Sequence, residues 1–519
     1  MSRAIKAAAL AAASLLVATS AVSWPALAQK AKDEMRVAIN DMFNTVDPYV
    51  LPHDEAGSFN RTVYSPMIAY QEREKKFVPM IAKSWKTIEP GVYEFELRDD
   101  VTFHSGNKLT ADDIKHTFDF FADPAVKIRF KARYDWLHPV EKLGEHKVRI
   151  RAKQPQADDM SKLAYRMRVF DSKVHAPLGY EKYGDYGRIS ASGTGPYKMV
   201  SIDRAHVVLE RFDDAKDDYQ RRAVRRYIGT HMPDEQTQVA QLLTGGVDAL
   251  RNISTDNAKA LAANPNLRVQ NMPSGDLVYI TLDAAGRSAS KVMTDERVRR
   301  AFIMAIDRDK LIKHIVPGDG TAEKNNAMCF DWTKDCSYSK KMPGYDPASA
   351  KKLLAEAGYP NGFDLVLNVH EPIRQIAEAV AGELRSVGIR ATVQPLPLLV
   401  YVKKRGDGEF TSFMGFYPTS ATPEMGNLMD FFFGQDRDYY KDDLILKVNA
   451  EANTEFDDAK RIAMFRSAAD RVIEKSYFLP FSSLPTAYAM TKDVKIMPDA
   501  FSYAGVYLND VVWADYTGK

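Results

Sequence analysis

Two cysteines are the residues whose spacing most directly suggests chemistry. Cys329 and Cys336 are the 2 cysteines of the chain, with residues 330–335 between them. They could begin a metal site, but the segment has no histidine, and two thiols fall short of a zinc ligand set. In an oxidising compartment two such thiols form a disulfide. The sequence therefore predicts a disulfide that closes a small loop, no metal site and no bound cofactor.

Catalytic motifs are present only as fragments. His370-Glu371 begins like the zinc-binding helix of a metalloprotease, but Arg374 stands where the second histidine would be, and Pro372 disrupts a helix interior. The chain contains neither a G-x-S-x-G elbow nor a phosphate-binding G-x-x-x-x-G-K-[ST] loop. We predict that the protein is not an enzyme. A secreted hydrolase is the alternative, because Ser, His and Asp occur throughout the chain and composition does not exclude a triad.

The first 28 residues resemble an export signal. Arg3 and Lys6 precede an uncharged run rich in Ala and Leu, and Ala26-Leu27-Ala28 fits the small-x-small pattern at a signal-peptidase site. The alternative is a membrane anchor, but about sixteen apolar residues are too few to span a bilayer comfortably. We therefore expect a periplasmic protein that is cleaved after Ala28.

Charge argues against nucleic acid as a partner. Cleavage would remove two positive charges, Arg3 and Lys6, so the formal net charge of +2 would fall to 0. A chain without excess positive charge has no long-range field that attracts nucleic acid or an anionic membrane. The mature chain is also longer than one hydrophobic core usually allows, so two or three domains are expected.

The elements that would position a site alternate between strands and helices. Residues 35–39, 74–103 and 147–150 have the spacing of strands, and Thr110 is expected to cap a helix with Asp113 in the capping-box position. Thr294 is expected to cap a longer helix that runs to about Ile315. Further helix–strand units are predicted at 347–369 and 373–394, and a last helix at 459–475. This order predicts a mixed α/β fold.

Seven segments together resemble the family 5 extracellular solute-binding proteins, the oligopeptide-, dipeptide- and nickel-binding components of ABC importers. The first three match P-x-L-A-x-S-W at 79–85, F-x-L-R-x-x-V-x-F-H-x-G at 95–106 and L-T-A-x-D-V at 109–114, with small variations. The others are G-T-G-P-Y at 193–197, an element similar to L-x-x-G-x-x-D at 243–248, R-V-R-x-A with A-x-D-R at 297–308, and Y-D-P with L-L-x-E-A-G-Y at 345–359.

The resemblance implies a two-lobed periplasmic-binding-protein fold of type II, similar to cluster C, which closes around a ligand by hinge motion. Lobe one would contain residues 29–70, 191–283 and 482–519, with an inserted subdomain at 71–190. Lobe two would span residues 284–481. The implied partners are a ligand and the permease of an ABC importer, and we expect a monomer.

The same resemblance indicates the ligand-binding residues. The loop with His53 and Asp54, the segment with Arg133, Tyr134 and Trp136, and the aromatic pair Phe416 and Tyr417 would line the pocket, and Arg405 would meet a ligand carboxylate. Thr419 stands where peptide-binding members have an Asp that captures the ligand's amino group. A hydroxyl cannot neutralise a buried ammonium, so we expect a ligand that carries a carboxylate and is not anchored by a free amine at Thr419.

Two ligand classes remain open on this basis. The first is a peptide or peptide-like compound that carries a carboxylate. The second is a non-peptide ligand such as an opine, a metal chelate or another small organic acid. The sequence does not separate them, because a guanidinium binds the carboxylate of either class equally well.

Overall fold

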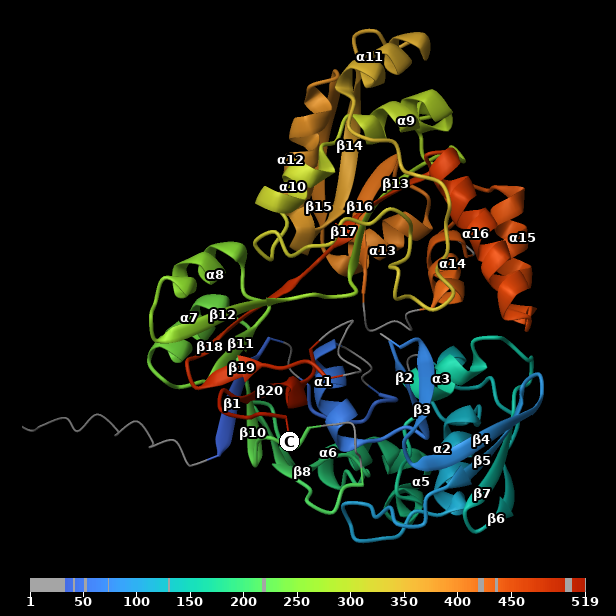
Figure 1. Cartoon of the computed structure of the whole chain (residues 1–519), viewed down its shortest axis with the longest axis vertical. Coiled ribbons are helices and arrows are strands. Elements are labelled where there is room, and N and C mark those ends of the chain that lie inside the picture. Colours follow the sequence, from blue (N-terminus) through green and yellow to red (C-terminus); the bar gives the residue numbers. More distant parts are fainter. Residues whose placement is uncertain are drawn as a thin grey trace, which may run out of the picture. The chain divides into compact units, whose positions relative to one another are not determined.

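The computed structural model describes residues 33–40, 43–50, 54–72, 74–128, 131–216, 221–418, 424–434, 437–499 and 506–518. The expected signal peptide and its cleavage site after Ala28 lie outside these ranges. Within them, strands and helices alternate and form several sheets, which confirms the predicted mixed α/β fold (Figure 1). None of the helices in these ranges has the length and apolar character needed to cross a membrane.

The first large sheet is built from segments that are far apart in the sequence. Its 7 strands lie in the order β12-β18-β11-β1-β10-β9-β8. β1 is parallel to β10 and β11, whereas β9 is antiparallel to β8 and β10. The bounds are β12 Leu267–Met272, β18 Thr486–Thr491, β11 Ala249–Arg251, β1 Glu34–Ile39, β10 Arg226–His231, β9 His206–Arg211 and β8 Tyr197–Ile202; this part of the chain also contains α1 Asp54–Val63, α7 Glu235–Leu243 and α8 Thr255–Ala262.

The second large sheet has 5 strands in the order β15-β14-β16-β13-β17. Their bounds are β15 Ile389–Leu396, β14 Phe363–His370, β16 Ser412–Tyr417, β13 Leu277–Leu282 and β17 Phe478–Ser483. Its helices are α9 Glu296–Met304, α10 Arg308–His314, α11 Pro347–Glu356, α12 Arg374–Arg385, α13 Leu398–Gly406, α14 Met425–Phe433, α15 Asp443–Glu451 and α16 Asp458–Glu474. The expected boundary at residue 283 placed β13 in lobe one, but β13 pairs with β16 and β17 of this sheet.

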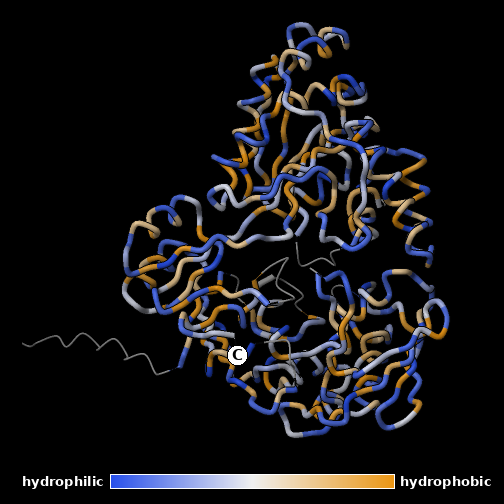
Figure 2. The backbone as a smooth tube through the Cα atoms, in the orientation of Figure 1, coloured by the Kyte–Doolittle hydropathy of each residue, from blue (hydrophilic) through white to orange (hydrophobic). Residues whose placement is uncertain are grey.

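Strand β13 supplies alternate residues to two hydrophobic cores, because successive side chains of a strand point to opposite faces. Val278, Ile280 and Leu282 pack in one core, whereas Leu277 and Tyr279 pack in the other. Hydrophobic residues therefore gather along the strands at the centre of this sheet (Figure 2). Burial on both faces makes β13 a fixed support for the strands beside it.

Between the strands of the first sheet, the chain inserts a smaller β structure with short helices. Strands β4 Ala82–Glu89, β5 Val92–Leu97, β7 Lys147–Arg151 and β6 Glu141–Gly144 form a sheet, and β2 Ile68–Gln71 pairs with β3 Lys76–Pro79. The helices of this insertion are α2 Ala111–Ala122, α3 Asp159–Arg166, α4 Ser172–His175, α5 Gly179–Lys182 and α6 Tyr186–Ile189. A further hairpin, β19 Val494–Ile496 with β20 Val511–Trp513, follows near the C-terminus.

Of the two helix caps predicted from the sequence, the cap at Thr110 is confirmed and the cap at Thr294 is wrong. Thr110 precedes α2, and its backbone N–H donates to Oδ2 of Asp113 over 2.8 Å, as expected for a capping box. The longer helix expected from Thr294 is instead two helices, α9 and α10. Asp295 caps α9, and Asp307 interrupts the run because its carboxylate accepts the N–H of Lys310 and caps a second helix.

The two glycines of the G-T-G-P-Y segment are required by close contact with the backbone of α1. A Cβ atom at Gly193 would lie 2.0 Å from the carbonyl oxygen of Val63, and one at Gly195 would lie 2.3 Å from that of Thr62. Only glycine permits this approach, since any side chain would overlap the backbone that ends α1. The motif therefore fixes the end of α1 against the strand that begins at Tyr197.

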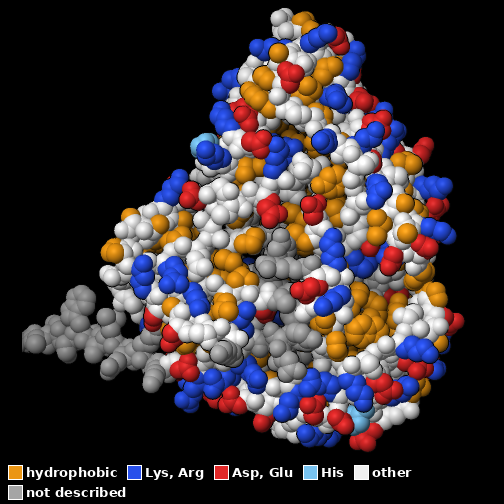
Figure 3. All heavy atoms as spheres, in the orientation of Figure 1, with side chains coloured by type: hydrophobic (Ala, Val, Ile, Leu, Met, Phe, Trp, Pro, Cys, Tyr) orange, Lys and Arg blue, Asp and Glu red, His pale blue; other side chains and the backbone are white. Residues whose placement is uncertain are grey.

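The surface shown in Figure 3 carries Lys, Arg, Asp and Glu side chains interspersed with one another. This mixture agrees with the near-zero charge that we expect for the mature chain. Such a face creates no large field of one sign.

Candidate ligand-binding site

Two predicted site residues, Arg133 and Tyr134, are neighbours in the chain, and the charge of Arg133 acts on a third, Tyr417. Tyr134 is buried, with 2% of its surface exposed, and its ring packs edge-on against Tyr49 at 4.8 Å between centroids. Arg133 is near enough to Tyr417, at the end of β16, for its charge to act on the Tyr417 hydroxyl. Burial raises the pKa of Tyr417, and Arg166 and Arg133 act in the opposite direction. The insertion and β16 thus both contribute to one aromatic and cationic site.

Arg166, which sequence reasoning missed, is the second arginine of this site. It is the last residue of α3, and its Nη2 donates to Oδ1 of Asn427 on α14 over 2.8 Å. Burial lowers the pKa of Arg133, and the neighbouring charge of Arg166 lowers it further, although the Arg133 side chain still reaches solvent. An anion near these two guanidinium groups would be attracted by both charges.

Two buried N–H donors near these elements have no acceptor among the described residues. They are Nδ2 of Asn427 and Nε1 of Trp136. Trp136 is partly buried, and Nζ of Lys162 lies 5.0 Å from the centre of its ring. Buried donors without acceptors are uncommon and cost free energy, so they commonly mark a place where water or a ligand binds.

Phe416 and Tyr417, the aromatic pair on β16, pack against different neighbours. Phe416 is partly buried and stacks with His370 at 5.2 Å between ring centroids. Tyr417 is buried and packs edge-on against Phe431 at 4.8 Å. Tyr417 therefore belongs with Arg133 and Arg166, whereas the contacts of Phe416 are those of a packed side chain.

Arg405 lies in an aromatic core of the second sheet. Only 7% of its surface is exposed, and its Nη1 donates to the Tyr279 hydroxyl over 3.3 Å. Its guanidinium carbon lies 5.8 Å from the ring centre of Tyr401 and 5.1 Å from that of Phe431. These contacts hold the residue by packing and cation–π attraction, whereas its Nε is buried with no acceptor among the described residues. Its role as a ligand contact stays a prediction.

The side chains of three predicted site residues lie outside the described part of the structure. His53 and Thr419 lie outside the described residues, and so does the side chain of Asp54, which begins α1. The expected loss of an amine-binding carboxylate at Thr419 therefore stays a prediction.

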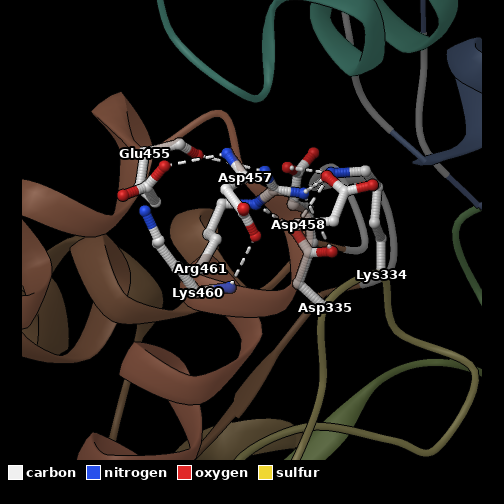
Figure 4. Close-up of polar contacts among 8 residues, drawn as sticks. Lys334, Asp335, Glu455, Asp457, Asp458, Lys460 and Arg461 are labelled. Atoms are coloured by element: carbon white, nitrogen blue, oxygen red, sulfur yellow. Dashed lines mark hydrogen bonds and ion pairs between the residues drawn. The ribbon is translucent and has the colours of Figure 1, made fainter.

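The predicted disulfide is confirmed, with Cys329 bonded to Cys336 and their Cα atoms 5.9 Å apart. Ion pairs attach its loop to Arg461 of α16 (Figure 4) and to Glu424, which precedes α14. Nε of Arg461 donates to Asp335 over 2.8 Å, and Nζ of Lys334 donates to Asp335 over 3.0 Å and to Glu424 over 2.8 Å. This network positions the residue that precedes α14, and α14 carries Asn427. Burial raises the pKa of Glu424, whereas the charge of Lys334 lowers it.

Across the described ranges, no group of three or more His, Cys, Asp and Glu side chains could hold a metal ion. What the described residues provide is a set of donors and aromatic walls, which can hold an anionic organic ligand.

Comparison with known proteins identifies the family. The model of the bacterial extracellular solute-binding proteins, family 5 middle, matches residues 76–440, which is more than half of the chain. The chain belongs to this family. Glutathione-binding protein GsiB of Shigella flexneri serotype 5b is a family 5 relative that is 25% identical, with 94% of this chain and 96% of GsiB covered.

Solved structures of binding proteins share the fold. The ABC transporter-associated periplasmic binding protein DppA of Helicobacter pylori, in complex with the peptide STSA, aligns with a TM-score of 0.68 at 20% identity over 92% of this chain and 98% of DppA. NikA of Brucella suis, in complex with Fe(III)-EDTA, aligns with a TM-score of 0.78 at 19% identity over 92% and 99%. These neighbours are two-lobed binding proteins rather than enzymes, and the present chain has their fold.

Proposed function

We propose that this protein captures a peptide or peptide-like ligand with a free carboxylate and delivers it to the permease of an ABC importer. The observation that carries the proposal is the hydrogen bond of 2.8 Å from Arg166 on α3 to Asn427 on α14, with the charges of Arg166 and Arg133 both acting on Tyr417. Each guanidinium can donate two parallel hydrogen bonds to a carboxylate, and the Asn427 amide offers another donor. The 25% identity to a glutathione-binding relative supports a small peptide that carries carboxylates.

We also propose that delivery depends on hinge closure. The chain passes between the two large sheets at residues 273–276 and again at 484–485. Connections this short can act as hinges, which absorb rotation in a few residues. The lobes proposed on this basis are the segments on either side of these crossings, with residues 71–190 as the insertion. Opening about these crossings would separate the Tyr417 side of the site from the arginines of the insertion, which are in contact here through Arg166 and Asn427.

A metal chelate is the second candidate ligand. Its support is the structural likeness to NikA, which was solved with Fe(III)-EDTA, a complex held by carboxylates. An arginine pair suits either ligand class because it recognises the carboxylate group itself. The two candidates differ in whether the bound compound contains a metal ion.

For localisation, we propose export to the periplasm with cleavage after Ala28, and a monomeric mature protein. The Ala26-Leu27-Ala28 pattern supports the cleavage site. N-terminal sequencing of protein from the periplasm should start at Gln29. A mature protein that retains Met1 would contradict this part of the proposal.

Isothermal titration calorimetry tests the ligand class. We expect glutathione or another small carboxylate-bearing peptide to bind at one site per chain, and the same peptide with its carboxylates esterified to bind at least tenfold more weakly. Fe(III)-EDTA should be titrated in parallel. Equal affinity for the free acid and the ester would contradict the proposal, and tight binding of the chelate alone would favour the second candidate.

A further inference from the structure

A small cavity that is partly open to solvent is lined by two more arginines. Arg61 and Arg168 line it together with Tyr165, Tyr507 and Asp499. Its lining residues come from α1, the insertion and the C-terminal segment. The charge of Arg168 in this cavity and the charge of Arg166 in the arginine pair both act on the Tyr134 hydroxyl.

Arg168 is held firmly and is nearly closed off from bulk water. Its backbone is fixed on both sides by the Tyr49 hydroxyl, which donates to the Arg168 carbonyl over 2.6 Å and accepts the Arg168 N–H over 3.0 Å. Only 5% of Arg168 is exposed, and its Nη1 donates to the carbonyl of Ala164 over 2.9 Å. The guanidinium is thus preorganised, so binding would cost little side-chain entropy.

The charge of Arg168 is poorly compensated. Burial lowers its pKa to about 9, and the neighbouring charge of Arg61 contributes to the lowering. After burial and Arg61, the largest influences on its pKa are the hydroxyls of Tyr49, Tyr507 and Tyr134, which are neutral phenols near pH 7. A buried guanidinium surrounded by neutral groups and another cation is unfavourable until an anion meets it.

Arg61 differs because acidic groups lie on its side of the cavity. Its guanidinium lies over the ring of Tyr507, with its carbon 3.8 Å from the ring centre. Burial acts to lower the pKa of Arg61, but Tyr507, Glu72 and other neighbours raise it. Glu72 also accepts a hydrogen bond from the Tyr165 hydroxyl over 3.1 Å. Glu72 and Asp499 therefore act on Arg61, whereas no carboxylate is among the largest influences on Arg168, although Asp499 lines the same cavity.

We propose that this cavity is a carboxylate-binding pocket in which Arg168 is the principal anchor and Arg61 the second. The carboxylate can belong to the transported ligand, as a second acidic group beside the one at Arg133 and Arg166, or to a separate small organic anion. The first case rests on the proposed function, whereas the second does not. A charge-assisted hydrogen bond from a fixed guanidinium favours either one.

Arg168→Met tests the pocket, with the exposed Arg204→Met as its matched control. Thermal unfolding is measured for both variants and for the native chain in sodium acetate and in sodium chloride of equal ionic strength. We expect acetate to raise Tm of the native chain and of Arg204→Met above the value in chloride, and to have no such effect on Arg168→Met. In chloride alone, Arg168→Met should unfold no lower than the native chain, since the substitution removes an uncompensated buried charge.

Calorimetry with glutathione, a peptide with two carboxylates, separates the two sources. An affinity at least tenfold lower in Arg168→Met assigns the pocket to the transported ligand. Unchanged affinity, together with loss of the acetate effect, assigns it to a separate anion. The acetate measurement itself does not require glutathione to bind, so the pocket can be tested even if the proposed ligand class is wrong.

Two results would contradict the proposed carboxylate-binding pocket. The first is an equal Tm of the native chain in acetate and in chloride, and the second is a Tm of Arg168→Met that acetate still raises. If Arg168→Met does not fold, Arg61→Met is measured in the same way, because Arg61 keeps partial solvent access. Its acetate effect should then be reduced, and an undiminished effect would overturn the proposal.

Discussion

The backbone N–H of Leu484 donates to the carbonyl of Asp276 over 2.9 Å, which ties together the two crossings between the large sheets. The N–H of Asp276 in turn donates to the hydroxyl of Ser274 over 2.9 Å, so the first crossing has its own local turn. Because both crossings are short and joined to each other, rotation about them can act as one hinge. This connection supports the proposed closure without requiring either sheet to deform.

Arg166→Met should weaken ligand binding by about ten- to a hundredfold. The estimate follows from a charge-assisted hydrogen bond worth about 1.5–3 kcal/mol. Calorimetry measures the effect, and the exposed Arg300→Met serves as a control that should leave affinity unchanged. Wild-type affinity in Arg166→Met would remove this residue from the proposed site.

Arg405→Ala should reduce stability more than affinity. The substitution removes the hydrogen bond to Tyr279 and the packing against Tyr401 and Phe431, which together suggest a loss of roughly 2–3 kcal/mol in the free energy of unfolding. Urea unfolding and calorimetry on the same variant separate the two roles. A fall in affinity beyond tenfold with unchanged stability would instead support the carboxylate contact expected from the sequence.

Asp47 gives the protein a pH dependence whose sign can be stated. Burial raises the pKa of Asp47 to about 7, although its carboxylate accepts the N–H groups of Tyr49 and Val50. The unfolded chain loses this proton near its ordinary pKa of about 4, whereas the folded chain keeps it until about 7. The contribution of Asp47 to stability therefore falls as pH rises from about 4 to about 7 and is constant above that.

Asp47→Asn removes this penalty and keeps an oxygen that can accept the same two N–H groups. The stability of the variant relative to the native chain should rise by roughly 2–3 kcal/mol between pH 5 and pH 8. Denaturant unfolding at several pH values measures this difference. A stability difference that is constant across this range would show that Asp47 is ionised in the folded chain throughout.

The disulfide should stabilise the mature protein. Replacing both Cys329 and Cys336 by Ala should lower the free energy of unfolding by about 2–3 kcal/mol, because the closed loop restricts the unfolded chain. Denaturant unfolding checks the size of the effect. Alkylation of the native protein should find no reactive thiol until reductant is added, and two thiols that react without reductant would contradict the bond.

Contacts between residues close in the chain can be predicted from this sequence, whereas contacts between distant residues cannot. The cap at Thr110 and the Cys329–Cys336 bond depend on residues close in the chain, so residue type and spacing sufficed. The helix from Thr294 was predicted too long because Asp307 reads as a surface residue on a helix but in fact caps α10.

The site around Arg133 and Arg166 depends on long-range contacts. Arg166 and Asn427 meet only after the insertion and the second sheet have folded, and no spacing in the sequence relates them. Arg405 was assigned to the ligand by resemblance, yet aromatic side chains that are distant in the sequence surround it. Burial of a charged residue by such neighbours cannot be seen in a local pattern.

Mass spectrometry of the compound released when the periplasmic protein is denatured tests the central claim most directly. The account predicts one small molecule per chain that carries a carboxylate, is peptide-like, and returns chemically unchanged after incubation with the protein. A released compound without any acidic group, or conversion of the added compound into products, would contradict it.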